Sequence, residues 1–264
     1  MLNTGLQNKV ALITGGSRGI GKSIAMAFAN EGVRLALCAR DERLLKQAVD
    51  ELQHATHADV IGVKANTTKL NDIRRFVDTA VKKFNRIDIL VNNAAGAHIG
   101  GIFDTTDEDW EYHLQLKLLG YIRMAREVVP HMKKNNGGKI INIVGMAGKE
   151  PSPQYMVPGV TNAALLNFTK SLSRELESSH ITVNSVNPGT TDTPMTVETF
   201  ASLARILEKT PDEVRQAVAA SFPGGRIAAA DDIARLVTFL ASDAANFING
   251  ISINSDAGKS SGLW

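Results

Sequence analysis

Short apolar runs alternate along the chain with stretches in which apolar residues recur at helical spacing. The apolar runs carry Val, Ile and Leu at successive positions, which is typical of strands buried on both faces of a sheet. Alternation of such strands with amphipathic helices predicts a parallel sheet covered by helices on both faces, and therefore an α/β fold. We expect about seven strands, at Lys9–Thr14, Val33–Ala39, Val60–Lys64, Ile87–Asn92, Lys139–Val144, Ile181–Val186 and Gly250–Asn254.

Amphipathic helical stretches fill the gaps between these strands. Residues 188–229 form the one long interruption, with helix-like pieces at Met195–Leu207 and Pro211–Ala220 and no strand pattern. Long excursions of this kind are often lids or binding loops. We therefore expect one domain over residues 1–264, with this segment as a lid over the substrate. The other expected helices are Gly19–Asn30, Asp41–His54, Leu70–Phe84, Asp107–Lys134, Pro158–Ser178 and Asp231–Ala241.

Composition narrows the class of protein. The 264 residues are 44% hydrophobic and 21% charged with a net charge of +2, and the basic residues are interspersed with acidic ones, so we expect no nucleic-acid partner. No apolar run approaches the roughly 18 residues that span a bilayer, and the first residues lack a signal-peptide pattern. The single Cys38 excludes an internal disulfide. We expect a cytoplasmic protein with no membrane partner and no metal.

A glycine-rich turn, TGGSRGIG, joins the first expected strand to the first expected helix at residues 14–21. Glycines there let the backbone turn sharply and approach a pyrophosphate, which rests on the helix N-terminus. The motif alone is weak, but its position between a strand and a helix strengthens it. It predicts a dinucleotide site that includes Gly15, Ser17, Arg18, Gly19, Ile20 and Gly21.

The end of the second expected strand bears on the choice of dinucleotide. An acidic residue there would bind the ribose 2′-hydroxyl of NAD, whereas Arg40 and Arg18 suit the 2′-phosphate of NADP. Asp41 follows directly and keeps NAD as an alternative, and Arg40 could instead be solvated beside an exposed carboxylate. We expect NADP(H) in preference to NAD(H).

Two further motifs follow in order: NNAAG at residues 92–96 and NPGTTDT at residues 187–193. With the glycine-rich turn, they make nearly the whole chain resemble the short-chain dehydrogenase/reductase (SDR) family. The resemblance implies a Rossmann-type, doubly wound parallel sheet that binds a nicotinamide dinucleotide. It implies that the cofactor is lined by Asn93, Ala94, Ala95 and Gly96 on the adenine ribose side, by Asn66 at the adenine, and by Pro188, Gly189, Thr191 and Thr193 at the nicotinamide end.

The resemblance also implies four catalytic residues, a Ser, a Tyr, a Lys and an Asn, which together protonate the substrate oxygen. A Tyr with a pKa near 10 needs such neighbours to act as an acid at neutral pH. Family spacing places these four at Gly145, Pro158, Asn162 and Lys117, so none of the expected residues is present. Loss of general acid catalysis lowers rates by about 10²–10⁴. Asn162 can still hydrogen-bond a ribose hydroxyl of the cofactor.

Tyr155 and Lys117 offer a replacement route for the proton. Tyr155 lies in the loop before the helix that carries Pro158, and Lys117 adds a cation on a helix that faces the site. Lys117 could lower the pKa of Tyr155 or act as the acid itself. The alternative is that Tyr155 packs at a subunit contact and Lys117 is structural. His98, after the NNAAG motif, is a minor candidate acid.

Three functions remain open. The first is an NADP(H)-dependent oxidoreductase that acts on a carbonyl or alcohol of a small to medium apolar molecule with a non-standard catalytic set. The second is a catalytically silent dinucleotide-binding sensor or scaffold, and the third is a non-redox lyase or isomerase in a pocket widened by Gly145. Family resemblance favours the first. It also implies a homodimer or homotetramer built on the helices at 107–134 and 158–178.

Overall fold

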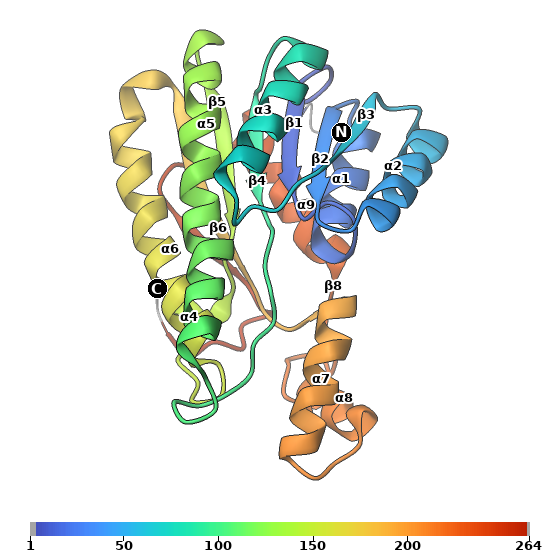
Figure 1. Ribbon diagram of the computed structural model, residues 1–264, viewed down its shortest axis with the longest axis vertical. Coiled ribbons are helices and arrows are strands. Elements are labelled where there is room, and N and C mark those ends of the chain that lie inside the picture. Colours follow the sequence, from blue (N-terminus) through green and yellow to red (C-terminus); the bar gives the residue numbers. More distant parts are fainter. Residues whose placement is uncertain (1–3, 263–264) are drawn as a thin grey trace.

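The computed structural model describes residues 4–262 and is built around one seven-stranded sheet (Figure 1). The strand order is β3-β2-β1-β4-β5-β6-β9, and every neighbouring pair is parallel. The order reverses between β1 and β4, where open α/β sheets bind ligands at the carboxyl ends of the strands. The expected Rossmann-type fold is therefore confirmed. The strands are β1 (Val10–Thr14), β2 (Arg34–Ala39), β3 (Val60–Lys64), β4 (Ile89–Asn92), β5 (Gly138–Ile143), β6 (Ile181–Pro188) and β9 (Ser252–Ser255).

Helices cover both faces of the sheet (Figure 1). Alternate side chains of each strand enter opposite cores: Ile13 of β1 packs with α1 and α9, whereas its neighbour Leu12 packs with α3 and α5. Burial on both faces explains the continuous apolar runs of the inner strands. The helices are α1 (Gly19–Asn30), α2 (Glu42–Thr56), α3 (Leu70–Phe84), α4 (Asp107–His113), α5 (Gly120–Lys134), α6 (Met156–Glu175), α7 (Pro194–Ile206), α8 (Pro211–Ala220) and α9 (Ala230–Ala241).

Several bounds shift by a few residues, as in α6, which was expected at Pro158–Ser178 and runs from Met156 to Glu175, and two larger differences from the expected elements occur. The helix expected over 107–134 is interrupted by a π-helical turn at Leu114–Leu119, which carries Lys117. Single π-turns inserted in α-helices are frequent at functional sites. The expectation that 188–229 holds no strand is wrong, because β7 (Thr191–Asp192) pairs with β8 (Ala228–Ala229). Strands of two residues are too short to leave a periodic pattern in the sequence.

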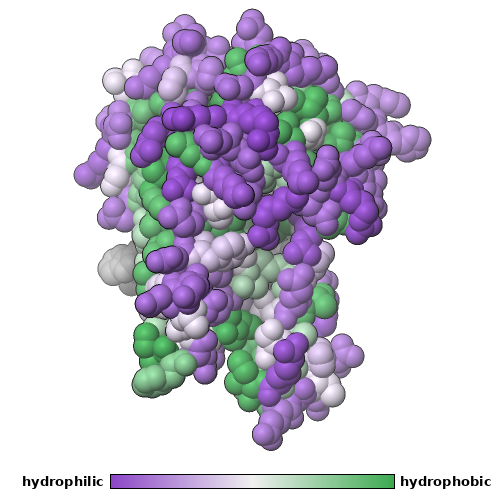
Figure 2. Space-filling view, in the orientation of Figure 1, coloured by the Kyte–Doolittle hydropathy of each residue, from purple (hydrophilic) through white to green (hydrophobic). Residues whose placement is uncertain are grey.

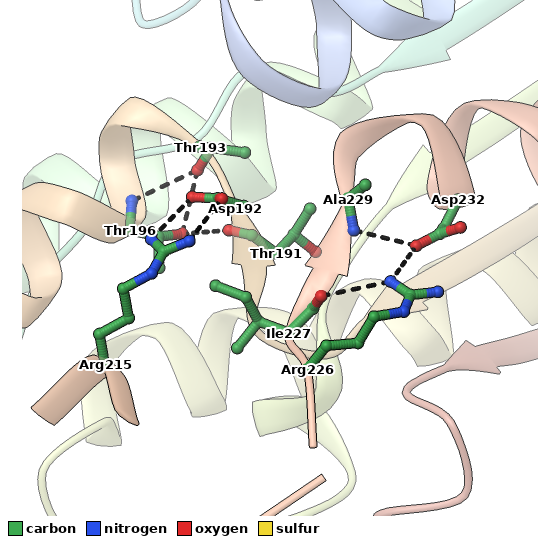
Figure 3. A network of polar contacts seen from close by, with 9 residues as sticks. All are labelled: Thr191, Asp192, Thr193, Thr196, Arg215, Arg226, Ile227, Ala229 and Asp232. Carbon is green, nitrogen blue, oxygen red and sulfur yellow. Dashed lines mark hydrogen bonds and ion pairs between the residues drawn. The ribbon is translucent and has the colours of Figure 1, made fainter. Parts of the chain in front are cut away.

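This small ladder closes the two ends of the excursion that carries α7 and α8 (Figure 3). Arg215 of α8 donates both terminal nitrogens to the carboxylate of Asp192, at 3.0 and 2.6 Å. On the other side, Arg226 donates to Asp232 at 2.8 Å. Phe200 of α7 belongs to a separate small apolar cluster formed with α8. The excursion is therefore a helical lobe with its own core, anchored at its base.

On the lower part of the molecule, apolar surface lies over the loop before α4 and over α7 (Figure 2). Ile102 and Phe103 of that loop are 57% and 99% exposed, and Val197 and Ile206 of α7 are more than half exposed. Within residues 4–262, no helix combines the length and the apolar character needed to cross a membrane.

Candidate active site

The glycine-rich turn after β1 has the backbone shape that its sequence predicts. Gly15 and Gly19 adopt φ angles of +68° and +56°, which favour glycine. A Cβ on Gly21 would lie 2.2 Å from the carbonyl oxygen of Gly15, so only glycine lets α1 start this close to the turn. Asn93 locks the turn to the end of β4, because its Nδ2 donates to the carbonyls of Thr14 and Gly15 at 3.0 and 3.1 Å.

A cleft of about 610 Å³ lies beside this turn at the carboxyl ends of the strands. Ala65, Thr67 and Leu44 also line it, and the sequence motifs did not identify them because they lie outside the glycine-rich and NNAAG segments. The predicted cofactor residues that line the cleft are Gly15, Ser17, Arg18, Gly19, Ile20, Arg40, Asn93, Ala94, Ala95 and Thr193.

The two arginines lie at the rim of this cleft. Arg18 pairs with Glu198 of α7 at 3.0 Å, and Arg40 donates to the Tyr112 hydroxyl. Both pairs are exposed, so a phosphate can compete for the guanidinium groups at small loss. Asp41 caps α2 by accepting the backbone N–H of Leu44 at 2.9 Å, which engages one of its carboxylate oxygens. The rim therefore offers positive charge. The nearest carboxylate, that of Asp41, is partly engaged in capping α2.

Asn66 does not line the cleft, in contrast to the expectation that it meets the adenine. Its Oδ1 accepts the backbone N–H of Thr68 at 3.1 Å, and its own backbone N–H donates to Asp72 at 2.8 Å. These two bonds form the turn that leads into α3. An Asn side chain that bonds to the backbone two residues further on is a turn device.

A second cavity, of about 320 Å³, continues from the first. Ile20, Asn93, Ala95, Thr193 and Met195 line both, so a ligand in the first can reach into the second. The second cavity brings together residues from α6, the π-turn, the strand ends and the base of α7. The predicted site residues that line it are Gly96, Lys117, Gly145, Tyr155, Pro158, Asn162, Pro188, Gly189, Thr191 and Thr193.

Lys117 is buried in the wall of this cavity, with 9% of its surface exposed. Its Nζ donates to Oδ1 of Asn162 at 2.7 Å and to the carbonyl oxygen of Val144. No carboxylate of the described residues 4–262 forms an ion pair with it. Burial without a counter-charge lowers the pKa of Lys117 to about 7. The amine can therefore both hold and release a proton near neutral pH.

Tyr155 lies directly before α6, as the sequence predicts, and the backbone N–H of Gly159 donates to its carbonyl oxygen at 2.8 Å. Burial raises the pKa of Tyr155, and a hydrogen bond with Thr199 of α7 lowers it in part. No hydrogen bond among the described residues joins Tyr155 to Lys117. The two groups therefore line one cavity, each with hydrogen-bond partners of its own.

Gly145 and Pro158 shape the cavity without supplying a functional group. Gly145 has a φ of +119° and a ψ of 152°, a conformation that is essentially restricted to glycine. A Cβ built on Gly145 would lie 3.1 Å from Nδ2 of Asn162. Pro158 is the third residue of α6, within the first turn, where no backbone N–H is needed.

His98 does not line the cavity, so the structure does not support it as a candidate acid. Its Nδ1 lies 3.6 Å from a carboxylate oxygen of Asp109, and its ring packs edge-on against His113 with centroids 5.5 Å apart. Its Nε2 is buried and has no partner among residues 4–262. The NNAAG motif brings His98 near the site in sequence, but the loop turns its ring toward α4.

Similarity to known proteins extends over the whole of this architecture. A family model described as enoyl-(acyl carrier protein) reductase matches residues 15–260. The chain belongs to the short-chain dehydrogenase/reductase family. An SDR relative, the 3-oxoacyl-(acyl-carrier-protein) reductase of Thermotoga maritima, is 32% identical over 253 residues, which are 96% of this chain and 98% of that enzyme.

Two solved SDR structures are similar to the chain throughout. The L-sorbose reductase of Gluconobacter frateurii, in complex with NADPH and L-sorbose, has a TM-score of 0.94 at 32% identity and covers 99% of this chain and 100% of its own. An actinorhodin polyketide ketoreductase with NADPH has a TM-score of 0.93 at 29% identity, covering 96% of this chain and 97% of its own. Likeness at this level makes the chain an SDR oxidoreductase.

For an SDR chain, the arrangement offers two chemical capabilities. The first cleft presents backbone N–H groups and two arginines to a dinucleotide. The second presents an amine with a pKa of about 7, a phenol and a side-chain amide to a small molecule. Thr199, which bonds to Tyr155, and the carbonyl of Val144, which bonds to Lys117, were not predicted, because no motif marks either position. Among residues 4–262, no group of three metal-ligating side chains lies close enough to hold an ion.

Proposed function

We propose that the chain is an NADP(H)-dependent reductase that interconverts a carbonyl and an alcohol in a small to medium apolar molecule, with Lys117 and Tyr155 in place of the usual SDR catalytic set. The observation that carries this proposal is the buried amine of Lys117. It lines a cavity continuous with the dinucleotide cleft and has a pKa of about 7. A general acid works best when its pKa lies near the working pH.

The residues of the first cleft fit a nicotinamide dinucleotide. The backbone of Gly15 and Gly19 and the close start of α1 leave room for a pyrophosphate at the N-terminus of that helix. Arg18 and Arg40 supply positive charge where a 2′-phosphate would lie, and this favours NADP(H). Two structural neighbours were solved with NADPH, which supports the same choice. When bound, the reduced cofactor supplies a hydride to the carbonyl carbon.

Lys117 supplies the proton for the carbonyl oxygen. An ammonium has three N–H donors, and the carbonyl of Val144 and Oδ1 of Asn162 take two of them. The third N–H is left for the cavity. As the substrate oxygen gains negative charge, that proton moves from Nζ to the oxygen and gives the alcohol. The neutral amine keeps both of its hydrogen bonds, so its position is unchanged when it takes a new proton from water.

The role of Tyr155 is to donate a hydrogen bond to the substrate oxygen and not to transfer a proton to it. Because burial raises its pKa, its hydroxyl stays protonated at neutral pH and donates well to an alkoxide. This assigns different tasks to the two members of the pair: Lys117 transfers the proton, and Tyr155 orients the oxygen from the side of α7. In this chain a Lys stands at position 117, where the family has Asn, and an Asn stands at position 162, where the family has Lys. This exchange keeps one cation in the cavity.

The cavity favours an apolar substrate. Val144, Met146, Met195, Phe200 and Leu203 form much of its wall. We propose that residues 188–229 act as a lid, because the lobe of α7 and α8 lines the cavity and has its own small core. We also propose a cytoplasmic homodimer or homotetramer, since Val160 of α6 and Tyr112 of α4 leave 50% and 39% of their surfaces exposed on the helices expected at the interface.

The proposal is tested by binding and turnover with the wild type, Lys117→Met and Tyr155→Phe. NADPH and NADH binding is followed by fluorescence, and cofactor oxidation is followed with cyclohexanone, acetophenone and ethyl acetoacetate, with L-sorbose as a polar comparison. We expect tighter binding of NADPH, turnover of the apolar ketones, and a loss of about 10²–10⁴ in kcat for Lys117→Met. Lys133→Met, an exposed change on α5, is the matched control.

Two results would count against this proposal. Tight NADPH binding without turnover of any ketone would indicate a silent dinucleotide-binding protein. Full turnover by both Lys117→Met and Tyr155→Phe would show that the pair has no catalytic task.

A further inference from the structure

The side-chain amide of Asn162 is held in one orientation. Lys117 can only donate hydrogen bonds, so the atom of Asn162 that lies 2.7 Å from Nζ is the oxygen Oδ1. The amide nitrogen Nδ2 must therefore point the other way. No acceptor among residues 4–262 bonds to this nitrogen, although the residue is only 4% exposed and lines the inner cavity.

The space in front of Nδ2 is kept open by Gly145. The nitrogen lies 3.1 Å from the point where a Cβ of Gly145 would sit. A side chain there would occupy that space, and the φ of +119° disfavours any residue other than glycine. The structure thus pairs a fixed, unpartnered N–H donor with an open volume beside it, in an otherwise largely apolar wall.

Because Nδ2 has no acceptor of its own and Asn162 lines the cavity, a ligand that brings an acceptor can bind to this nitrogen. We propose that Asn162 Nδ2 is the donor that binds the substrate's carbonyl oxygen, in the space over Gly145, and that Lys117 also acts as the positioning residue that fixes this amide. The inference rests on the proposed reductase function and names the group that recognises its substrate. Lys117 and Asn162 line the same cavity with Nζ and Oδ1 2.7 Å apart, so the proposal places both donors at one substrate oxygen.

The same donor favours the reaction as well as binding. During reduction the carbonyl oxygen gains negative charge, and a hydrogen bond to a charged acceptor is stronger than one to a neutral acceptor. A fixed donor in a buried site stabilises that charge without reorganisation, and removal of one such donor typically lowers kcat by about 10²–10³. Gly145 and Asn162 are then two parts of one feature, an open space and the donor that faces it.

The decisive variant is Asn162→Asp, which has nearly the same shape. One carboxylate oxygen keeps the bond to Lys117, and the other replaces the Nδ2 donor by an acceptor. Asn167→Asp, an exposed change on the same helix, is the matched control. Asn162→Leu is a second variant that removes the donor without adding charge, in case the carboxylate disturbs the fold.

The readout is the C=O stretching frequency of a bound ketone, measured by infrared difference spectroscopy with carbonyl-labelled probes and NADP⁺. The probes are cyclohexanone, acetophenone and ethyl acetoacetate. The oxidised cofactor cannot reduce them, so the measurement needs no turnover. We expect a lowered stretching frequency in the wild type and in Asn167→Asp, a return toward the value of the unbound ketone in both Asn162 variants, and weaker ketone binding in those variants.

Three results would overturn the inference. One is the same stretching frequency in the wild type and both Asn162 variants. Another is a loss of NADPH affinity in these variants with no change in the ketone signal, which would assign the amide to a cofactor hydroxyl. The third is a wild type that binds none of the ketones. Failure of the reductase proposal is recognised separately, as a wild type that shows this ketone signal but does not oxidise NADPH.

Discussion

Replacement of Lys117 by Met should change how the stability of the fold depends on pH. The pKa of Lys117 is about 7 in the fold, against an ordinary value of 10.5, because the amine is buried. Between these values the unfolded chain binds a proton that the folded chain does not. Raising the pH through this window therefore stabilises the wild type, and the destabilising effect of the buried amine is greatest at and below pH 7.

The magnitude follows from the same two values. Between pH 7 and pH 9 the free energy of unfolding of the wild type should rise by about 2 kcal/mol relative to Lys117→Met. His113 lies near Lys117, but burial lowers its pKa below the ordinary value of 6.5, so it is neutral throughout this window. Other titrating groups are common to both proteins and leave the difference unchanged.

Urea unfolding at pH 7, 8 and 9 measures this difference, and Lys133→Met serves as the control for removal of an exposed charge. We expect the wild type and the control to gain stability together with rising pH, and Lys117→Met to lag behind. If the free energies of the wild type and Lys117→Met change in parallel across the three pH values, the amine is not buried as the structure describes, and the assignment of Lys117 as an acid loses its basis.

Three further outcomes follow from the site. Arg40→Ala should weaken NADPH binding roughly ten- to hundredfold and affect NADH binding little, since a charged hydrogen bond contributes about 1.5–3 kcal/mol. Fluorescence titration measures both affinities. Equal losses for both cofactors, or the same loss in the exposed control Arg43→Ala, would contradict this expectation. Gly145→Ser should lower the free energy of unfolding by about 1–3 kcal/mol without raising activity. The φ of +119° is unfavourable for a residue other than glycine, and Asn162 lies too close to a new side chain. A variant that is as stable as the wild type and more active would refute this. Burial raises the pKa of Cys38 to about 12, so this thiol should resist thiol reagents at pH 7 until urea unfolds the protein. Fast reaction of the native protein would show instead that the thiol is accessible.

Local sequence signals predicted much of the fold. The bounds of α1, α3 and α8 are those expected from helical periodicity, since each has a clear apolar face and Pro211 marks the start of α8. The inner strands were found because burial on both faces leaves continuous apolar runs. The glycine-rich turn could be predicted because Gly15 and Gly19 adopt positive φ angles and Gly21 packs too closely for a side chain.

The interior of the site could not be predicted in the same way. The bond between Lys117 and Asn162 joins residues 45 positions apart, and its geometry depends on a π-turn that no local pattern announces. The partnership of Tyr155 with Thr199 depends on how the α7 lobe returns to the sheet. Sequence spacing could identify the residues that share a pocket, but which atoms meet is decided by tertiary packing.

The central claim is that Lys117 protonates the substrate during hydride transfer. The most direct test is the pH dependence of kcat/KM for ketone reduction by the wild type and by Lys117→Met, from pH 5.5 to 9.5. We expect a constant value for the wild type at low pH and a fall of about tenfold per pH unit above roughly pH 7, as the ammonium is lost. Lys117→Met should be slower by about 10²–10⁴ and should lack this inflection. The same inflection in Lys117→Met, or none in the wild type, would contradict the assignment of Lys117 as the acid.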